Sequence, residues 1–223
     1  MKEQKEEKVL ETNDLITKGQ AFFEKNGKLL IIIVCAILVV LVAIFGLRRW
    51  YFQPREVEAS EQMYAAEQWF GQGNYELALN GNDAHLGFAA MIDEYGGTKA
   101  ANLAKYYAGI SSLRLGNYDD AIEYLGKYKA KDTFTKPMAM MAIGDAEMEK
   151  GDTESAINHY LKAVSAEDNF VTAPTALFKA GLGYIMLGKG KEAADCLKQI
   201  KTKYPESTGW NEVDKYIAYA ENM

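Results

Sequence analysis

Apolar residues are distributed unevenly along the chain. Residues 29–47 read LLIIIVCAILVVLVAIFGL, 19 positions without a charged or strongly polar side chain. At about 1.5 Å per residue, a helix of this length spans roughly 28 Å, close to the hydrocarbon thickness of a bilayer. A core helix of a soluble protein rarely runs so long without a polar position, because one face usually meets water. The pattern therefore predicts one membrane-spanning helix at Leu29–Leu47.

The residues on either side of this segment agree with a membrane span. Lys28 precedes it, Arg48 and Arg49 follow it, and the aromatic residues 50–52 come next, where side chains at headgroup level are expected. The apolar segment is longer than the core of a cleaved signal peptide, and no small-x-small site precedes Arg48. We therefore expect an anchor that is retained.

The polar tail, residues 1–28, leaves two questions open. Close to the membrane the two sides carry similar numbers of basic residues, and only the lysines of the whole tail favour a cytoplasmic N-terminus. Thr12-Asn13-Asp14 is a possible N-cap, and apolar residues at helical spacing follow it. This predicts a short amphipathic helix that either lies on the membrane surface or extends the span.

Beyond Pro54 the sequence repeats a glycine-containing turn followed by an alanine. The four copies begin at Gly73, Gly116, Gly151 and Gly188, separated by 43, 35 and 37 residues. Seven residues before these glycines stand small residues, namely Ala66, Gly109, Gly144 and Gly181. Two antiparallel helices approach closely only where their side chains are small, and a tight turn favours a residue that tolerates positive φ. The pattern predicts consecutive helix pairs.

This period resembles the tetratricopeptide repeat (TPR) over residues 59–207, and Tyr118–Leu125 is especially similar to the second helix of that family. The resemblance implies an all-α fold, a right-handed α-solenoid of about four TPR-like helix pairs. We expect a linker at 48–58 and a TPR domain at 59–223, with repeats near 59–101, 102–136, 137–173 and 174–207 and a capping helix at 208–222. The first repeat contains about eight additional residues around 80–83.

In this family the first helix of each repeat lines a concave surface, which we expect to bind apolar segments of protein partners. Methionine is frequent there, and its flexible side chain suits varied apolar partners. The alternative is that these residues fill the curve of a tight superhelix or lie under the capping helix. The predicted groove residues are Met63, Phe70, Tyr106, Ile110, Leu113, Met138, Met141, Met148, Phe178, Leu182 and Met186.

Composition excludes several other functions. With 25 Lys and Arg against 31 Asp and Glu, the net charge of −6 disfavours nucleic-acid binding. Two cysteines and two histidines provide neither a disulfide framework nor a His-rich metal site. The glycine-rich segments 181–183 and 188–191 lack the preceding strand of a phosphate loop. We expect no enzymatic activity, no cofactor, no metal and no small-molecule substrate.

One span followed directly by TPR-like repeats resembles the ancillary subunit family of the SecYEG translocon, the YfgM-like envelope proteins. That resemblance implies a bacterial inner-membrane protein with a cytoplasmic tail and a periplasmic repeat domain. It also implies the translocon, periplasmic chaperones or secreted clients as partners. The function expected is a membrane-anchored interaction adaptor, and the alternative is a structural scaffold that assembles an envelope complex without handling clients.

Overall fold

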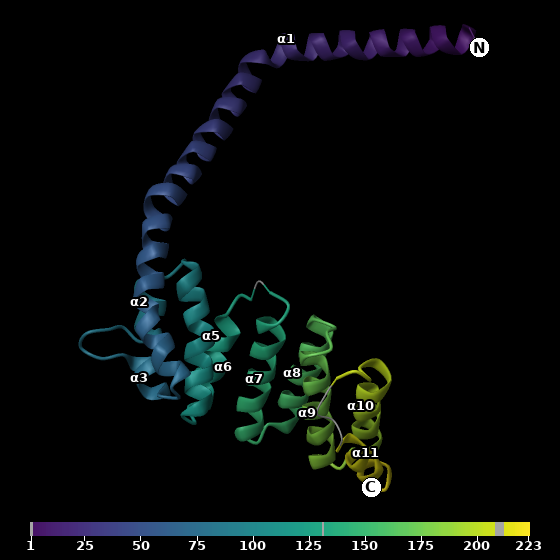
Figure 1. Cartoon of the computed structure of the whole chain (residues 1–223). Helices are drawn as coiled ribbons and strands as arrows, with labels where there is room; N and C mark the ends of the chain where they lie inside the picture. Colours follow the sequence, from purple (N-terminus) through teal and green to yellow (C-terminus); the bar gives the residue numbers. More distant parts are fainter. Residues whose placement is uncertain (1, 131, 208–211) are drawn as a thin grey trace. The chain divides into compact units, whose positions relative to one another are not determined.

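The structure, a computed structural model, describes residues 2–130, 132–207 and 212–223, and among the side chains of residues 2–24 only that of Thr17 (Figure 1). The chain divides into two compact units, Met1–Pro54 and Arg55–Met223. Within the described ranges the regular structure is helical, apart from one isolated antiparallel bridge between Gly81 and Leu86.

The first unit is built on α1, Lys2–Gly46, which contains the expected apolar segment. Its apolar side chains are exposed around the helix, and the exposed fraction is 57% at Leu29 and 70% at Phe45. The helix is long enough and apolar enough to cross a membrane. Because α1 runs without a break from Lys2, the tail backbone continues the helix of the span. The apolar tail side chains of the predicted amphipathic helix lie outside the described residues.

The expected linker at 48–58 is helical instead. Leu47–Phe52 forms a π-helical segment, in which the backbone N–H of Gln53 donates to the carbonyl of Arg48, five residues earlier. Pro54 explains the wider turn, because its nitrogen has no hydrogen to donate to the carbonyl four residues before it. Helix α2, Gln53–Gly71, follows directly. The prediction gives 48–58 as a juxtamembrane linker without assigning it a secondary structure, and the structure makes it helical.

The second unit is an α-solenoid of helix pairs. We call the first helix of each pair an A helix and the second a B helix. The A helices are α2, α5 (Lys99–Arg114), α7 (Thr135–Glu149) and α9 (Thr172–Met186). The B helices are the pair α3 and α4 (Tyr75–Asn80, Phe88–Glu94), then α6 (Tyr118–Lys127), α8 (Thr153–Ala166) and α10 (Gly190–Lys203). Consecutive helices pack side by side from α4 to α11, Val213–Glu221 (Figure 1).

The turn inside each pair forms as predicted. Gly73, Gly116, Gly151 and Gly188 have φ of 77°, 81°, 83° and 70°, values that a residue with a side chain rarely adopts. The next residue caps the B helix in two of the four pairs. Asn74 accepts a hydrogen bond from the N–H of Leu77, and Asp152 accepts one from that of Ser155.

The small residues of the A helices lie at the A–B contact, which confirms their predicted role. A Cβ on Gly109 would stand 2.5 Å from Cγ of Leu125, and one on Gly181 would stand 2.8 Å from Cγ of Leu197. On Gly144 it would stand 2.6 Å from the ring of Tyr160. These gaps are shorter than a carbon–carbon contact, so only glycine permits the observed helix spacing.

The insertion in the first repeat divides its B helix into α3 and α4, joined by residues 81–87. Gly81 and Gly87 bring the two ends of this loop together, since a Cβ on Gly87 would lie 2.3 Å from the backbone nitrogen of Gly81. Asn82 closes the tip by accepting hydrogen bonds from the N–H groups of Ala84 and His85. The loop therefore leaves and rejoins the B helix at nearly one point.

The last helix, α11, covers α10 as a cap. Val213, Ile217 and Ala220 are buried on one stripe, as the sequence predicts, while residues 208–211 of the expected capping segment lie outside the described ranges. A terminal repeat needs such a cover because no further repeat buries its apolar face.

We predict that Gly109→Ala destabilises fragment 55–223. The new methyl group would meet Leu125, and overpacking of this kind costs about 1–3 kcal/mol. Gly126→Ala is the matched control, because its Cβ would meet nothing within 4 Å and removing a helical glycine stabilises by up to about 1 kcal/mol. Urea unfolding followed by circular dichroism measures both, and equal effects from the two variants would contradict the A–B contact.

Candidate protein-binding surface

The eleven predicted groove residues lie on the four A helices, but the structure exposes them very differently. Met63 and Met141 are buried, with 6% and 8% of their surface exposed. Met63 packs with Ala59 and Ala66 in the core of the first two repeats, and Met141 packs with Leu177 in the core of the last two. Neither side chain offers appreciable surface to a partner.

Six other groove residues are half-buried and fill the space between helices. Phe70 contacts the rings of Phe88 and Tyr107, with centroids 6.2 and 4.9 Å away. Tyr106, Ile110 and Leu113 pack against the core residues that join α6 and α7. Met148 and Phe178 pack against the core of the last two repeats.

Three groove residues are more available. Met138 is 42% exposed at the start of α7, and Met186 is 67% exposed at the end of α9. Leu182 is half-buried and lies one turn before Met186. The structure thus brings together an apolar A-helix face, most of which is already used in packing between repeats.

A polar bridge crosses the middle of the same face. Asp145 of α7 accepts hydrogen bonds from Tyr160 of α8 at 2.8 Å and from the ammonium of Lys179 of α9 at 2.6 Å. Burial, followed by the charge of Asp145, raises the pKa of Tyr160, so its hydroxyl stays a donor. The predicted groove residues do not include this bridge. The 34-residue separation of Asp145 and Lys179, one repeat period, is the signal that could have found this pair.

The two ends of the face differ in character. Towards the first repeat, burial raises the pKa of Glu67, next to the aromatic cluster of Phe70 and Tyr107. Towards the C-terminus, Tyr216 of α11 meets Phe178 edge to face at 5.4 Å. The capping helix therefore covers Phe178 in the last repeat. Cover by the capping helix is one of the alternatives to a binding groove that the sequence leaves open.

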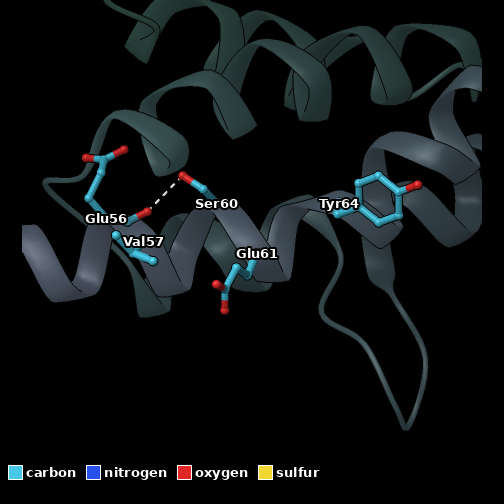
Figure 2. A pocket seen from close by; sticks show the side chains of 5 residues that line it. All are labelled: Glu56, Val57, Ser60, Glu61 and Tyr64. Atoms are coloured by element: carbon cyan, nitrogen blue, oxygen red, sulfur yellow. Dashed lines mark hydrogen bonds between the residues drawn. The ribbon is translucent and has the colours of Figure 1, made fainter.

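A hollow of about 560 Å³ lies along α2. Figure 2 shows its five lining residues, Glu56, Val57, Ser60, Glu61 and Tyr64, spaced along this helix. Val57 and Tyr64 are 59% and 64% exposed. Glu56 has a structural task, because its carboxylate accepts the backbone N–H groups of Lys99 and Ala100 at 2.7 and 3.0 Å. It thereby caps the positive end of α5.

Among the described residues, no group of three His, Cys, Asp or Glu side chains is placed to hold a metal ion. Nδ1 of His159 lies 2.7 Å from Oε2 of Glu147, a hydrogen bond between α8 and α7. Gly190, the first residue of α10, lies close to α11, since a Cβ on it would stand 2.4 Å from the carbonyl oxygen of Ala220.

Comparison with known proteins supports the repeat architecture. The family model "Tetratricopeptide repeat" matches residues 103–132 and 175–207. Among solved structures, "Crystal structure of MamA protein" matches with a TM-score of 0.59 and 19% identity, covering 74% of this chain and 81% of that one. Comparison with curated proteins gives no significant match.

The matched segments cover the second repeat and the last, and the helix pair between them has the same turn and the same A–B contact. The chain therefore contains tetratricopeptide repeats arranged as an α-solenoid. Repeats of this kind commonly form scaffolds that bind other proteins, and the match supports protein partners in general.

We predict that Cys196 is unreactive in the folded protein. It is 6% exposed, and burial raises the pKa of its thiol to about 11. Against the ordinary value of 9, this lowers the thiolate fraction at pH 8 about 100-fold. In a Cys35→Ala background, a thiol reagent should react with Cys196 only after denaturant is added. Rapid labelling of the native protein would contradict this burial.

Proposed function

We propose that this chain is a membrane-anchored adaptor that holds protein partners through its repeat domain and performs no catalysis. One observation carries the proposal. A helix whose apolar side chains are exposed on every side leads, without a non-helical residue, into the first A helix of a TPR solenoid. A helix of this kind is stable only in an apolar medium, so a bilayer is its natural surrounding.

The helix is proposed as a retained anchor rather than a cleaved signal. A signal peptidase needs an extended segment with small residues after the apolar core. Here the segment after the core, Arg48–Gln53, is helical and contains Trp50, Tyr51 and Phe52. Cleavage there would also remove the residues that begin α2. The domain boundaries proposed are a tail at 1–28, a span at 29–47 and a repeat domain beyond it.

The anchor has a physical consequence for binding. Confining a domain next to a membrane complex raises its effective concentration there, so contacts that are weak in solution become sufficient. The A-helix face is apolar, is partly exposed and carries the Asp145–Lys179 bridge, so it suits weak binding of a partner. Leu182 and Met186 supply apolar area, and the Asp145–Lys179 pair supplies a position for a partner's polar group.

The location proposed is the bacterial inner membrane, with a cytoplasmic N-terminus and a periplasmic repeat domain. The partners proposed are the SecYEG-type translocon, periplasmic chaperones or secreted clients. The support is the architecture, an apolar helix followed directly by a small repeat domain. No small-molecule substrate, metal or cofactor is required.

A second function, a structural scaffold that assembles one envelope complex, is favoured by the packing of the A-helix face. A promiscuous client-binding groove needs adaptable exposed methionines, yet Met63 and Met141 are buried and Met148 is half-buried. A single partner that fits the remaining surface would not need them. The two functions differ in the number of proteins that contact Leu182 and Met186.

Photocrosslinking from these positions tests the proposal. A photoreactive residue placed at Leu182 or Met186 of the full chain should yield protein adducts in cells. The same residue at Tyr219, 59% exposed on α11, is the matched control and should yield none. One stoichiometric adduct supports the scaffold, and a series of adducts supports client binding. Adducts from Tyr219 alone, or from none of the three, would contradict an adaptor that uses the A-helix face.

A further inference from the structure

The starts of the A helices form a continuous rim. Glu56 in the first turn of α2 binds the first N–H groups of α5. Asn102 in α5 exchanges two hydrogen bonds with the backbone of Lys129, at 2.9 and 3.0 Å. Asn169, before α9, donates to the carbonyl of Thr133, before α7. We call these A-helix starts and the loops that lead into them the A-start rim, which Figure 1 shows at one end of the repeat domain.

Large apolar side chains are exposed on this rim. Phe134, Met138, Phe170 and Val171 are 50%, 42%, 72% and 52% exposed, half of the eight large exposed hydrophobics described after Val57. Clustering of this kind on a soluble surface marks a contact with a partner or a membrane.

The loops hold these side chains outward in a fixed geometry. Asp132 accepts hydrogen bonds from the N–H groups of Phe134 and Thr135 at 2.9 and 2.6 Å. Asn169 does the same for Val171 and Thr172, at 2.9 and 2.8 Å. The two aromatic residues therefore stand on capped helix starts that are joined to each other, and not on independent loop tips.

One stretch of the rim is rich in lysine. Residues 127–136 contain four lysines and one aspartate, a local charge of +3 in a chain of net charge −6. Lys127 is paired with Glu123. Lys129 lines a hollow of about 440 Å³ together with Lys99 and Lys105. The loop before α9 adds apolar area but no positive charge, since Glu167 and Asp168 precede Phe170.

Few residues separate the start of the rim from the apolar helix along the sequence. The first turn of α2 is part of the rim, and only residues 47–52 stand between α2 and the end of α1. If α1 spans a bilayer, as proposed above, the residues that begin the rim follow the span closely in the chain.

We infer that the A-start rim docks on the surface of an anionic bilayer, with Phe134 and Phe170 at headgroup level and a lipid phosphate between Lys99, Lys105 and Lys129. Aromatic side chains favour that depth, and lysines next to a membrane are attracted to anionic lipids. The inference rests on the proposed membrane anchor. Docking would set the tilt of the solenoid on the membrane, and hence the direction in which the A-helix face points.

A fluorescent probe reports this contact in the full chain. In a Cys35→Ala background, Phe134→Cys and Phe170→Cys are labelled with NBD and reconstituted into phosphatidylcholine vesicles with or without phosphatidylglycerol. With the anionic lipid, the emission should intensify, shift to shorter wavelength and be quenched by headgroup spin labels, and high salt should reverse this. Met186→Cys is the matched control, an exposed apolar position at the opposite end of α9, and its emission should not change.

Charge reversal provides a second readout. Lys99→Glu with Lys129→Glu should abolish the NBD response at Phe134→Cys, whereas Lys191→Glu, an exposed lysine in the first turn of α10, should leave it unchanged. Flotation of every sample with the vesicles checks the anchor. Loss of flotation would contradict the proposed function itself.

Flotation without an NBD response would overturn the docking inference alone. An equal response in both lipids would also overturn it, because the charge would have no part. A shift of the NBD emission in detergent that grows with protein concentration would show that the rim contacts a second copy of the chain. A shift of the NBD emission that appears only after a protein partner is added would show that the rim contacts that partner.

Discussion

The close approach of the two helices in each repeat is the constraint on which the rest of the solenoid depends. At Gly109, Gly144 and Gly181 the B-helix side chain occupies the place where a Cβ would stand. This spacing lets buried alanines of the B helices, such as Ala121 and Ala156, reach complete burial. Each helix pair packs as one unit, and successive pairs stack on one another. The curvature and exposure of the A-helix face follow from that stacking.

The sequence predicts the parts of the structure that depend on local chemistry. A turn needs positive φ and a close helix contact needs a small residue, so the glycines and Ala66 identify the pairs without further information. Exposure of the A-helix face is different, because it depends on how far adjacent repeats rotate. Met141 and Met186 are both predicted to face the groove, yet one is 8% exposed and the other 67%. The helical form of 48–58 is not predicted either, because the sequence pattern gives this segment only as a linker.

The two units have opposite solvent requirements. The first exposes apolar side chains that water disfavours, while the second buries its alanines and leucines and presents charged side chains to water. A chain that combines them is suited to a water–bilayer boundary, where each unit meets its preferred medium. The A-start rim likewise places exposed aromatic side chains near charged lysines. A domain held at that boundary needs only modest affinity for a partner in the same membrane.

The central claim, that α1 stays in the protein as its anchor, is tested most directly by the mass and the extraction behaviour of the mature chain. We expect the purified protein to have the mass of an uncleaved chain, near 24.9 kDa, and to remain in the membrane fraction after alkaline carbonate treatment. A mature protein that begins after residue 47 and is released by carbonate would contradict the account.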